Sequence, residues 1–106
     1  MKKHYGDFLK RLENAIDIRS SDEFKSSAWS TEQWLVALTG EVGELCNFEK
    51  KAWRDGNVDP IDIENEVADI LIYLVAFAIH KGIDLEAVTI RKFNITSEKR
   101  GYKTRL

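Results

Sequence analysis

The chain has 106 residues, of which 43% are apolar and 32% charged, a composition typical of soluble globular proteins. This length suits one compact domain and is too short for two, so we predict a single domain over residues 1–106. The formal net charge of −2 comes from 16 basic and 18 acidic residues. The chain therefore lacks the excess of basic residues that general nucleic-acid binders have, and no nucleic-acid partner is expected.

The single cysteine, Cys46, excludes an intrachain disulfide and a cysteine-based zinc site. The first residues lack the apolar run of a signal peptide. The longest apolar stretch, residues 70–79, is too short to span a bilayer. The sequence therefore predicts a cytoplasmic protein with no membrane partner.

The first predicted helix covers residues 4–18, where apolar side chains recur at helical spacing from Phe8 to Ile16. Residues 19–28 are polar and serine-rich, and this composition predicts a loop. The second predicted helix covers residues 31–53. Ser30 and Gln33 form a capping-box pattern at its start, and Gly56 belongs to a stop signal after its end.

The third predicted helix covers residues 60–81, with Asp59 as the cap, Pro60 at the first helical position and Gly82 after the last turn. The fourth covers residues 84–100 and begins at Asp84. No segment shows the sustained alternation of a β-strand, and the loops after the second and third helices are short. These features predict an all-α, four-helix bundle-like fold.

Two carboxylate pairs stand in the most apolar stretches of the second and third helices. Glu41 and Glu44 are three residues apart, as are Glu66 and Asp69, so each pair lies on one helix face. The pairs could lie on outer faces and simply be solvated. Acids within an apolar packing stripe are less easily explained in that way, and this setting favours a shared site between the helices.

Four like charges between two helices would repel each other and lose hydration, and cations relieve both costs. Carboxylate oxygens suit Mg²⁺, with Mn²⁺ as a substitute. A di-iron bundle would instead need a Glu-x-x-His motif in two helices, and Glu44 and Asp69 occupy the positions where those histidines would stand.

Neighbouring residues on the same helices support a ligand site. Gly40 and Gly43 stand in mid-helix, where each glycine costs about 1 kcal/mol relative to alanine. We expect such a cost where another helix or a ligand approaches closely. Lys51 and Tyr73 follow the acidic pairs on the same helix faces.

The acidic motifs resemble those of the all-α nucleoside triphosphate pyrophosphohydrolases, the MazG-like group that includes the helical dCTP pyrophosphatases. The resemblance extends to the strings ALTGEVGEL at residues 37–45, EVADILIYL at residues 66–74 and KFN at residues 92–94. It covers roughly residues 29–102. It implies a MazG-type subunit, Mg²⁺-dependent cleavage of a (d)NTP to a (d)NMP and pyrophosphate, and house-cleaning of deoxynucleotide pools.

The resemblance also implies roles for individual residues. It makes all four carboxylates metal ligands, with Glu41 or Glu44 acting on the attacking water. The substrate contacts that we expect are Lys51, Tyr73, Lys92, Asn94, Trp29 and Arg100. Trp29 is chosen for base stacking because it lies where a loop enters a helix. The family assembles as homodimers or homotetramers, with active sites near subunit interfaces.

Two other functions remain open on the sequence. One is hydrolysis of another pyrophosphate-bearing nucleotide, such as phosphoribosyl-ATP. The other is a non-catalytic helical dimerisation module that has kept the fold without the chemistry.

Overall fold

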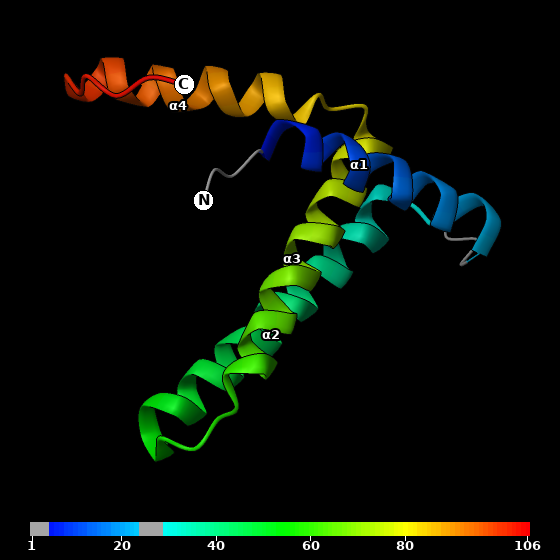
Figure 1. The fold of residues 1–106 in the computed structure, drawn as a ribbon, viewed down its shortest axis with the longest axis vertical. Helices are drawn as coiled ribbons and strands as arrows, with labels where there is room; N and C mark the ends of the chain where they lie inside the picture. The colour runs from blue at the N-terminus through cyan, green and yellow to red at the C-terminus, as the bar shows by residue number, and fades with distance from the viewer. Residues whose placement is uncertain (1–4, 24–28) are drawn as a thin grey trace.

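The computed structural model describes residues 5–23 and 29–106, which form four α-helices and one π-helical turn. Helix α1 covers Tyr5–Ile18, α2 Thr31–Asp55, α3 Pro60–Lys81 and α4 Leu85–Arg100. The predicted helix ends agree with these bounds to within two residues. His4, the predicted first residue, lies outside the described residues. The all-α, bundle-like class is confirmed (Figure 1).

The helix ends are set by the residues that the sequence marks as caps. The Ser30 hydroxyl accepts a hydrogen bond from the Gln33 amide at 3.2 Å, and the Gln33 side chain accepts one from the Ser30 amide at 2.8 Å. This reciprocal pair is the predicted capping box. Helix α2 continues to Asp55 and stops at Gly56, whose φ of 65° is in the left-handed region that glycine readily adopts.

The prediction of a loop from residue 19 is wrong for Arg19–Glu23, which form a π-helical turn, η1, directly after α1. Ser20 follows Ile16 by four residues and is only 7% exposed, so burial continues along the same face beyond the end of α1. The Ser21 hydroxyl donates a hydrogen bond to the Asp17 carbonyl at 3.0 Å. The predicted loop residues 24–28 lie outside the described part of the chain.

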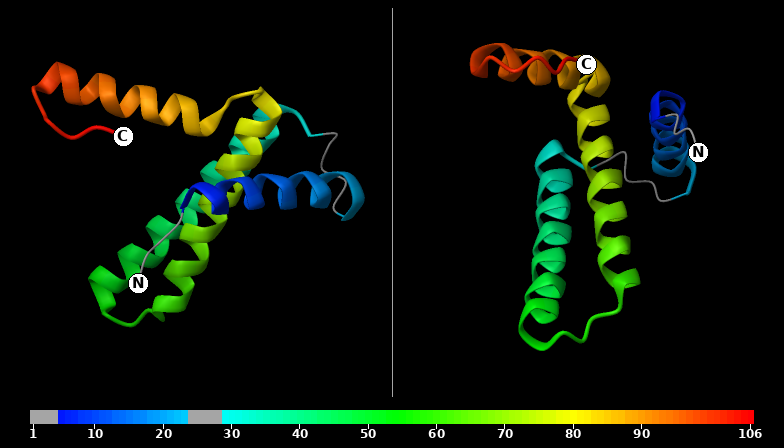
Figure 2. Two further views of the ribbon diagram at one scale, coloured as in Figure 1. Left: turned by 45° about the horizontal axis from the view of Figure 1, so that its top comes forward. Right: turned by 60° about the vertical axis from the view of Figure 1, so that its left-hand side comes forward.

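Helices α2 and α3 form a long antiparallel hairpin, and α1 crosses α3 near one end of it (Figures 1 and 2). The buried apolar core lies where the three helices meet and contains Ile16, Trp34, Val75 and Ala76. These side chains fix the hairpin and α1 relative to one another. The site described below lies between the two long helices, beside this core.

Helix α4 extends away from the hairpin in every view (Figures 1 and 2). Its side chains Ile90, Phe93 and Ile95 are exposed. The chain then turns back along α4, and Asn94 pairs with the backbone of Leu106: the Leu106 amide donates to Asn94 Oδ1 at 2.9 Å, and Asn94 Nδ2 donates to the Leu106 carbonyl at 3.3 Å. One copy of the chain thus leaves much of the apolar surface of α4 uncovered.

No helix among the residues described here combines the length and hydropathy needed to cross a membrane.

Candidate active site

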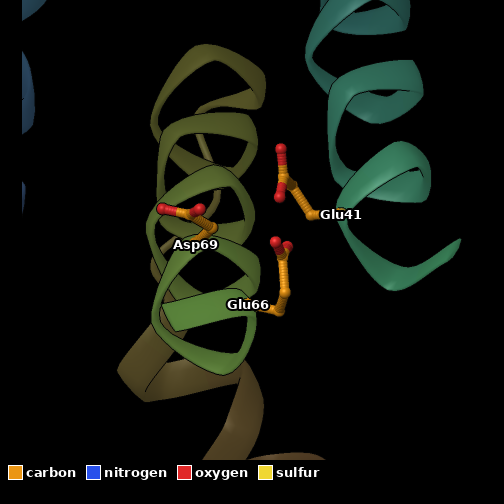
Figure 3. A group of neighbouring side chains, drawn as sticks. All are labelled: Glu41, Glu66 and Asp69. Carbon is orange, nitrogen blue, oxygen red and sulfur yellow. The ribbon is translucent and has the colours of Figure 1, made fainter. Parts of the chain in front are cut away.

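Three of the four predicted carboxylates meet between the long helices. Glu41 comes from α2, and Glu66 and Asp69 come from successive turns of α3. One carboxylate oxygen from each residue lies within 4.8 Å of the others. Figure 3 shows Glu41 and Glu66 extending toward each other across the space between the helices. The i, i+3 spacing in α3 and the antiparallel pairing with α2 therefore produce the predicted juxtaposition.

Burial distinguishes these acids from ordinary surface carboxylates. Glu66 is only 9% exposed, and Glu41 and Asp69 are half-buried. Acidic side chains are rarely buried unless they are paired or bind a cation. The alternative in which both pairs lie on outer, solvated faces does not hold for Glu66.

The environment of Glu66 disfavours its negative charge. Its pKa is raised from 4.5 to about 8, chiefly because the protonated carboxyl can share a hydrogen bond with Glu41. Burial and the nearby carboxylate of Glu44 raise the pKa further. Glu66 Oε2 is buried and has no hydrogen-bond partner among the described residues. A proton relieves this repulsion, and a cation could do the same.

The donor set fits a hard divalent cation. All three groups offer oxygen, which Mg²⁺, Mn²⁺ and Ca²⁺ prefer, and no cysteine or histidine joins them among the residues that the structure describes. The partnerless, buried Oε2 of Glu66 is the kind of atom that coordination would satisfy. The structure therefore contains an acidic triad, Glu41, Glu66 and Asp69, that could hold a metal ion.

Glu44 lies beside the triad without belonging to it. Its side chain is exposed, yet its charge and hydrogen-bonding capacity both raise the pKa of Glu66, which places the two carboxylates close together. Three of the four acids therefore converge, and the fourth stands at the solvent side of the group.

A pocket of about 300 Å³ opens next to the triad. Asp69 contributes to both the triad and the pocket wall. The described residues that line it are Ile16, Arg19, Ser20, Trp34, Asp69, Ile72, Tyr73 and Ala76. Its walls are mainly apolar with a few polar groups, as is usual for small-molecule sites.

Tyr73 connects the pocket with the acidic triad. Its pKa is raised above 10.0 by burial and then by the negative charges of Glu41 and Asp69. The hydroxyl is therefore protonated at neutral pH and is a hydrogen-bond donor next to the carboxylates. Tyr73 therefore lines the pocket at its border with the triad, and its role as a substrate contact stays a prediction.

Trp34, and not Trp29, lines this pocket. Trp34 is 4% exposed, and its ring centroid lies 6.0 Å from that of Tyr73 and 5.1 Å from that of His80. Trp29 packs against Trp34, with ring centroids 4.8 Å apart, and lines a separate surface pocket with residues of the first turns of α2. Sequence reasoning singled out Trp29, although Trp34 stands seven residues before Glu41 and hence on the same helix face.

Arg19 and Ser20 are pocket residues that the sequence analysis did not identify. Both belong to η1, in the segment that the sequence predicts to be a loop. The spacing of Arg19 and Ser20 after Ile16, at i+3 and i+4, was the available signal.

The remaining predicted substrate contacts do not join the triad within one chain. Lys51 is exposed on α2, with its ammonium 5.8 Å from the ring centroid of Phe48. Lys92, Asn94 and Arg100 stand on α4, the helix that extends away from the hairpin. Asn94 is already paired with Leu106.

The two mid-helix glycines face open space in this chain. A Cβ atom at Gly40 or Gly43 would meet no atom of the described residues within 4 Å, apart from its own helix backbone and chain neighbours. The expected close approach by another helix is therefore not made by the described part of this chain. Space beside Glu41 remains for a ligand or for another subunit.

Comparison with known proteins agrees with the acidic motifs. The chain is 37% identical over 74 residues to human dCTP pyrophosphatase 1 and 35% identical over the same length to the protein of that name from Rattus norvegicus. Each match covers 61% of this chain and 42% of the relative, so the chain spans less than half the length of the curated relatives it matches. No family model and no solved structure matches. These similarities confirm the resemblance of the chain to the helical dCTP pyrophosphatases of the MazG-like, all-α nucleoside triphosphate pyrophosphohydrolases.

Proposed function

We propose that this protein is a Mg²⁺-dependent nucleoside triphosphate pyrophosphohydrolase that converts a (d)NTP into a (d)NMP and pyrophosphate. The observation that carries the proposal is the acidic triad beside a pocket of about 300 Å³, with Asp69 common to both. The similarity to proteins named dCTP pyrophosphatase 1 supports the same reaction class. House-cleaning of deoxynucleotide pools is the role that this activity would serve.

In this proposal, Glu41, Glu66 and Asp69 hold the divalent cation. The cation, when bound, neutralises negative charge on the phosphates and orients them. Since Glu44 lies outside the triad and is exposed, it is the carboxylate left to accept a proton from the attacking water. The water oxygen forms a bond to the α phosphorus, and the phosphoanhydride bond between the α and β phosphates breaks. Pyrophosphate leaves, and the nucleoside monophosphate remains.

The pocket next to Asp69 takes the nucleoside in this assignment. Tyr73 donates a hydrogen bond at the junction of the pocket and the triad, and Trp34 gives an aromatic wall. Small-molecule sites span about 300–1,000 Å³, so this pocket stands at the small end of that range. The name of the similar proteins, dCTP pyrophosphatase 1, supports a single-ring base as the group that occupies this pocket.

The experiment that tests the proposed function is turnover of a nucleotide panel. The purified protein with Mg²⁺ should release a nucleoside monophosphate and pyrophosphate in equal amounts, with pyrimidine deoxynucleoside triphosphates as the best substrates. The panel should include Mn²⁺, ribonucleotides and phosphoribosyl-ATP, because preference for the last would assign the alternative reaction. A folded protein that turns over none of these compounds would contradict the proposal and favour a non-catalytic helical module.

We also propose that the active species is a homodimer or homotetramer. The exposed apolar side chains of α4 and the open space beside Gly40 and Gly43 support association between copies. Within one chain, the basic and amide side chains predicted to contact the phosphates lie away from the triad. A second copy could bring its own set toward the phosphates: Lys51 on α2, and Lys92, Asn94 and Arg100 on α4. Light scattering coupled to gel filtration should give two or four times 12.2 kDa. A fully active species of 12.2 kDa would exclude a shared site.

A further inference from the structure

Two residues of the π-helical turn η1 complete the wall of the pocket beside the acidic triad. Arg19 and Ser20 line it together with Trp34, Asp69 and Tyr73. Neither residue has a role in the proposed hydrolysis described above. Among the described residues, Arg19 is the only lysine or arginine in the lining.

The local structure explains how η1 brings these residues to the pocket. Ile16, Arg19 and Ser20 stand at i, i+3 and i+4, the spacing that places side chains on one helix face. Ile16 and Ser20 are 6% and 7% exposed and pack into the molecule on both sides of the junction between α1 and η1, whereas Arg19 is exposed at the mouth of the pocket that it lines. π-Helical turns are rare and occur frequently at functional sites.

The chemistry of the lining indicates what Arg19 can recognise. A guanidinium group has five N–H donors and no acceptor, so its ligand must offer an acceptor such as a carbonyl or phosphate oxygen. No ion pair joins Arg19 to Asp69 among the described residues, which leaves the guanidinium available to a ligand. The phosphates belong with the cation at the triad, and the pocket beyond Asp69 therefore receives the base.

We infer that Arg19, held by η1 at the wall of the nucleoside pocket, is a specificity-determining residue that donates hydrogen bonds to a carbonyl oxygen of a single-ring base. This inference rests on the proposed function for the position of the phosphates. Arg19 acts on the uncharged end of the substrate, away from the bond that breaks. Its contribution is therefore to substrate affinity and base choice, and the chemical step proceeds without it.

Steady-state kinetics of Arg19→Ala with dCTP and Mg²⁺ are the first test. A hydrogen bond to a charged group changes binding affinity by about ten- to hundredfold. Because Arg19→Ala loses such a bond to the base, KM should rise by that factor while kcat changes little. Arg19→Lys should recover only part of the loss, because an ammonium lacks the planar fork of a guanidinium. Arg11→Ala removes the same residue type from an exposed position on α1 outside the pocket and is the matched control.

Direct binding separates this inference from the proposed reaction. Deoxycytidine, which has no phosphate, should bind the wild-type protein and quench the fluorescence of Trp34 at the pocket wall. Arg19→Ala should weaken deoxycytidine binding, and Arg11→Ala should leave it unchanged. If the wild-type protein binds deoxycytidine but turns over no nucleotide, the proposed hydrolysis is contradicted. The pocket would still be supported as a nucleoside-binding site.

Two results would overturn the role of Arg19. One is an unchanged KM and unchanged deoxycytidine affinity in a fully active Arg19→Ala protein. The other is a loss of binding of inorganic pyrophosphate with no change for deoxycytidine, which would place the guanidinium at the phosphates.

Discussion

Replacing Glu41 with glutamine should reduce turnover by at least about a hundredfold, because charge stabilisation by a bound metal ion contributes several kcal/mol and each 1.36 kcal/mol corresponds to tenfold in rate. Glutamine keeps the shape of the side chain but removes the charge that, with Glu66 and Asp69, would hold the cation. Release of pyrophosphate under saturating Mg²⁺ measures the effect. Asp69→Asn should give the same result.

The fold should survive these substitutions. Glu41 is the main cause of the raised pKa of Glu66, so its neutralisation removes repulsion between α2 and α3. Circular dichroism should therefore show an unchanged helix content for Glu41→Gln. Glu49→Gln, an exposed change on the same helix, is the matched control and should keep full activity. Comparable turnover by Glu41→Gln and Glu49→Gln would remove Glu41 from the active site.

The metal-free protein should become less stable as the pH rises from 5.5 to 9, because Glu66 must lose its proton within the folded structure. The pKa of this carboxyl is about 8 in the fold and near 4.5 when unperturbed, so between these values the folded state binds more protons than the unfolded state. The contribution of Glu66 to stability is fully present below the unperturbed value and is lost as the pH passes through about 8. Thermal unfolding in the presence of a chelator should show a falling Tm.

Mg²⁺ should act in the opposite direction. Metal ions and protons compete for the same carboxylates, so the increase in Tm on adding Mg²⁺ should be larger at pH 9 than at pH 5.5. Glu66→Gln should flatten both effects, while Glu64→Gln, an exposed change on α3, should leave them as in the wild-type protein. A Tm profile that is the same for Glu66→Gln and the wild type would show that this carboxyl does not titrate as the structure indicates.

Much of the fold follows from local signals in the sequence. Ser30, Asp59 and Gly56 specify helix ends through their own backbone and side-chain hydrogen bonds, and such contacts need no knowledge of the tertiary structure. The carboxylate pairs were also accessible, because a spacing of three residues fixes a common helix face. The convergence of Glu41, Glu66 and Asp69 then follows from the pairing of two long helices joined by a short loop.

The parts that could not be predicted depend on contacts between distant segments. Polar residues such as Ser20 favour loops by composition, yet this segment forms a helical turn in which Ser20 is buried. The spacing of Trp34 and Glu41 places both on one helix face, but the meeting of Trp34 with Ile16 in one pocket wall depends on where α1 crosses the hairpin, which no local pattern encodes. The direction of α4 is set at its junction with α3. The spacing of apolar residues predicts that α4 is a helix, but it does not predict this direction.

Asp69 belongs to two sites at once, since its carboxylate is part of the acidic triad and also lines the pocket. Any displacement of this side chain on filling one site changes the environment of the other. Such coupling is reciprocal: whatever factor the cation adds to nucleotide affinity, the nucleotide adds to cation affinity. The protein would then bind a nucleotide together with its cation more tightly than a free nucleoside, because the two ligands bind cooperatively. Asp69 is the side chain that couples them.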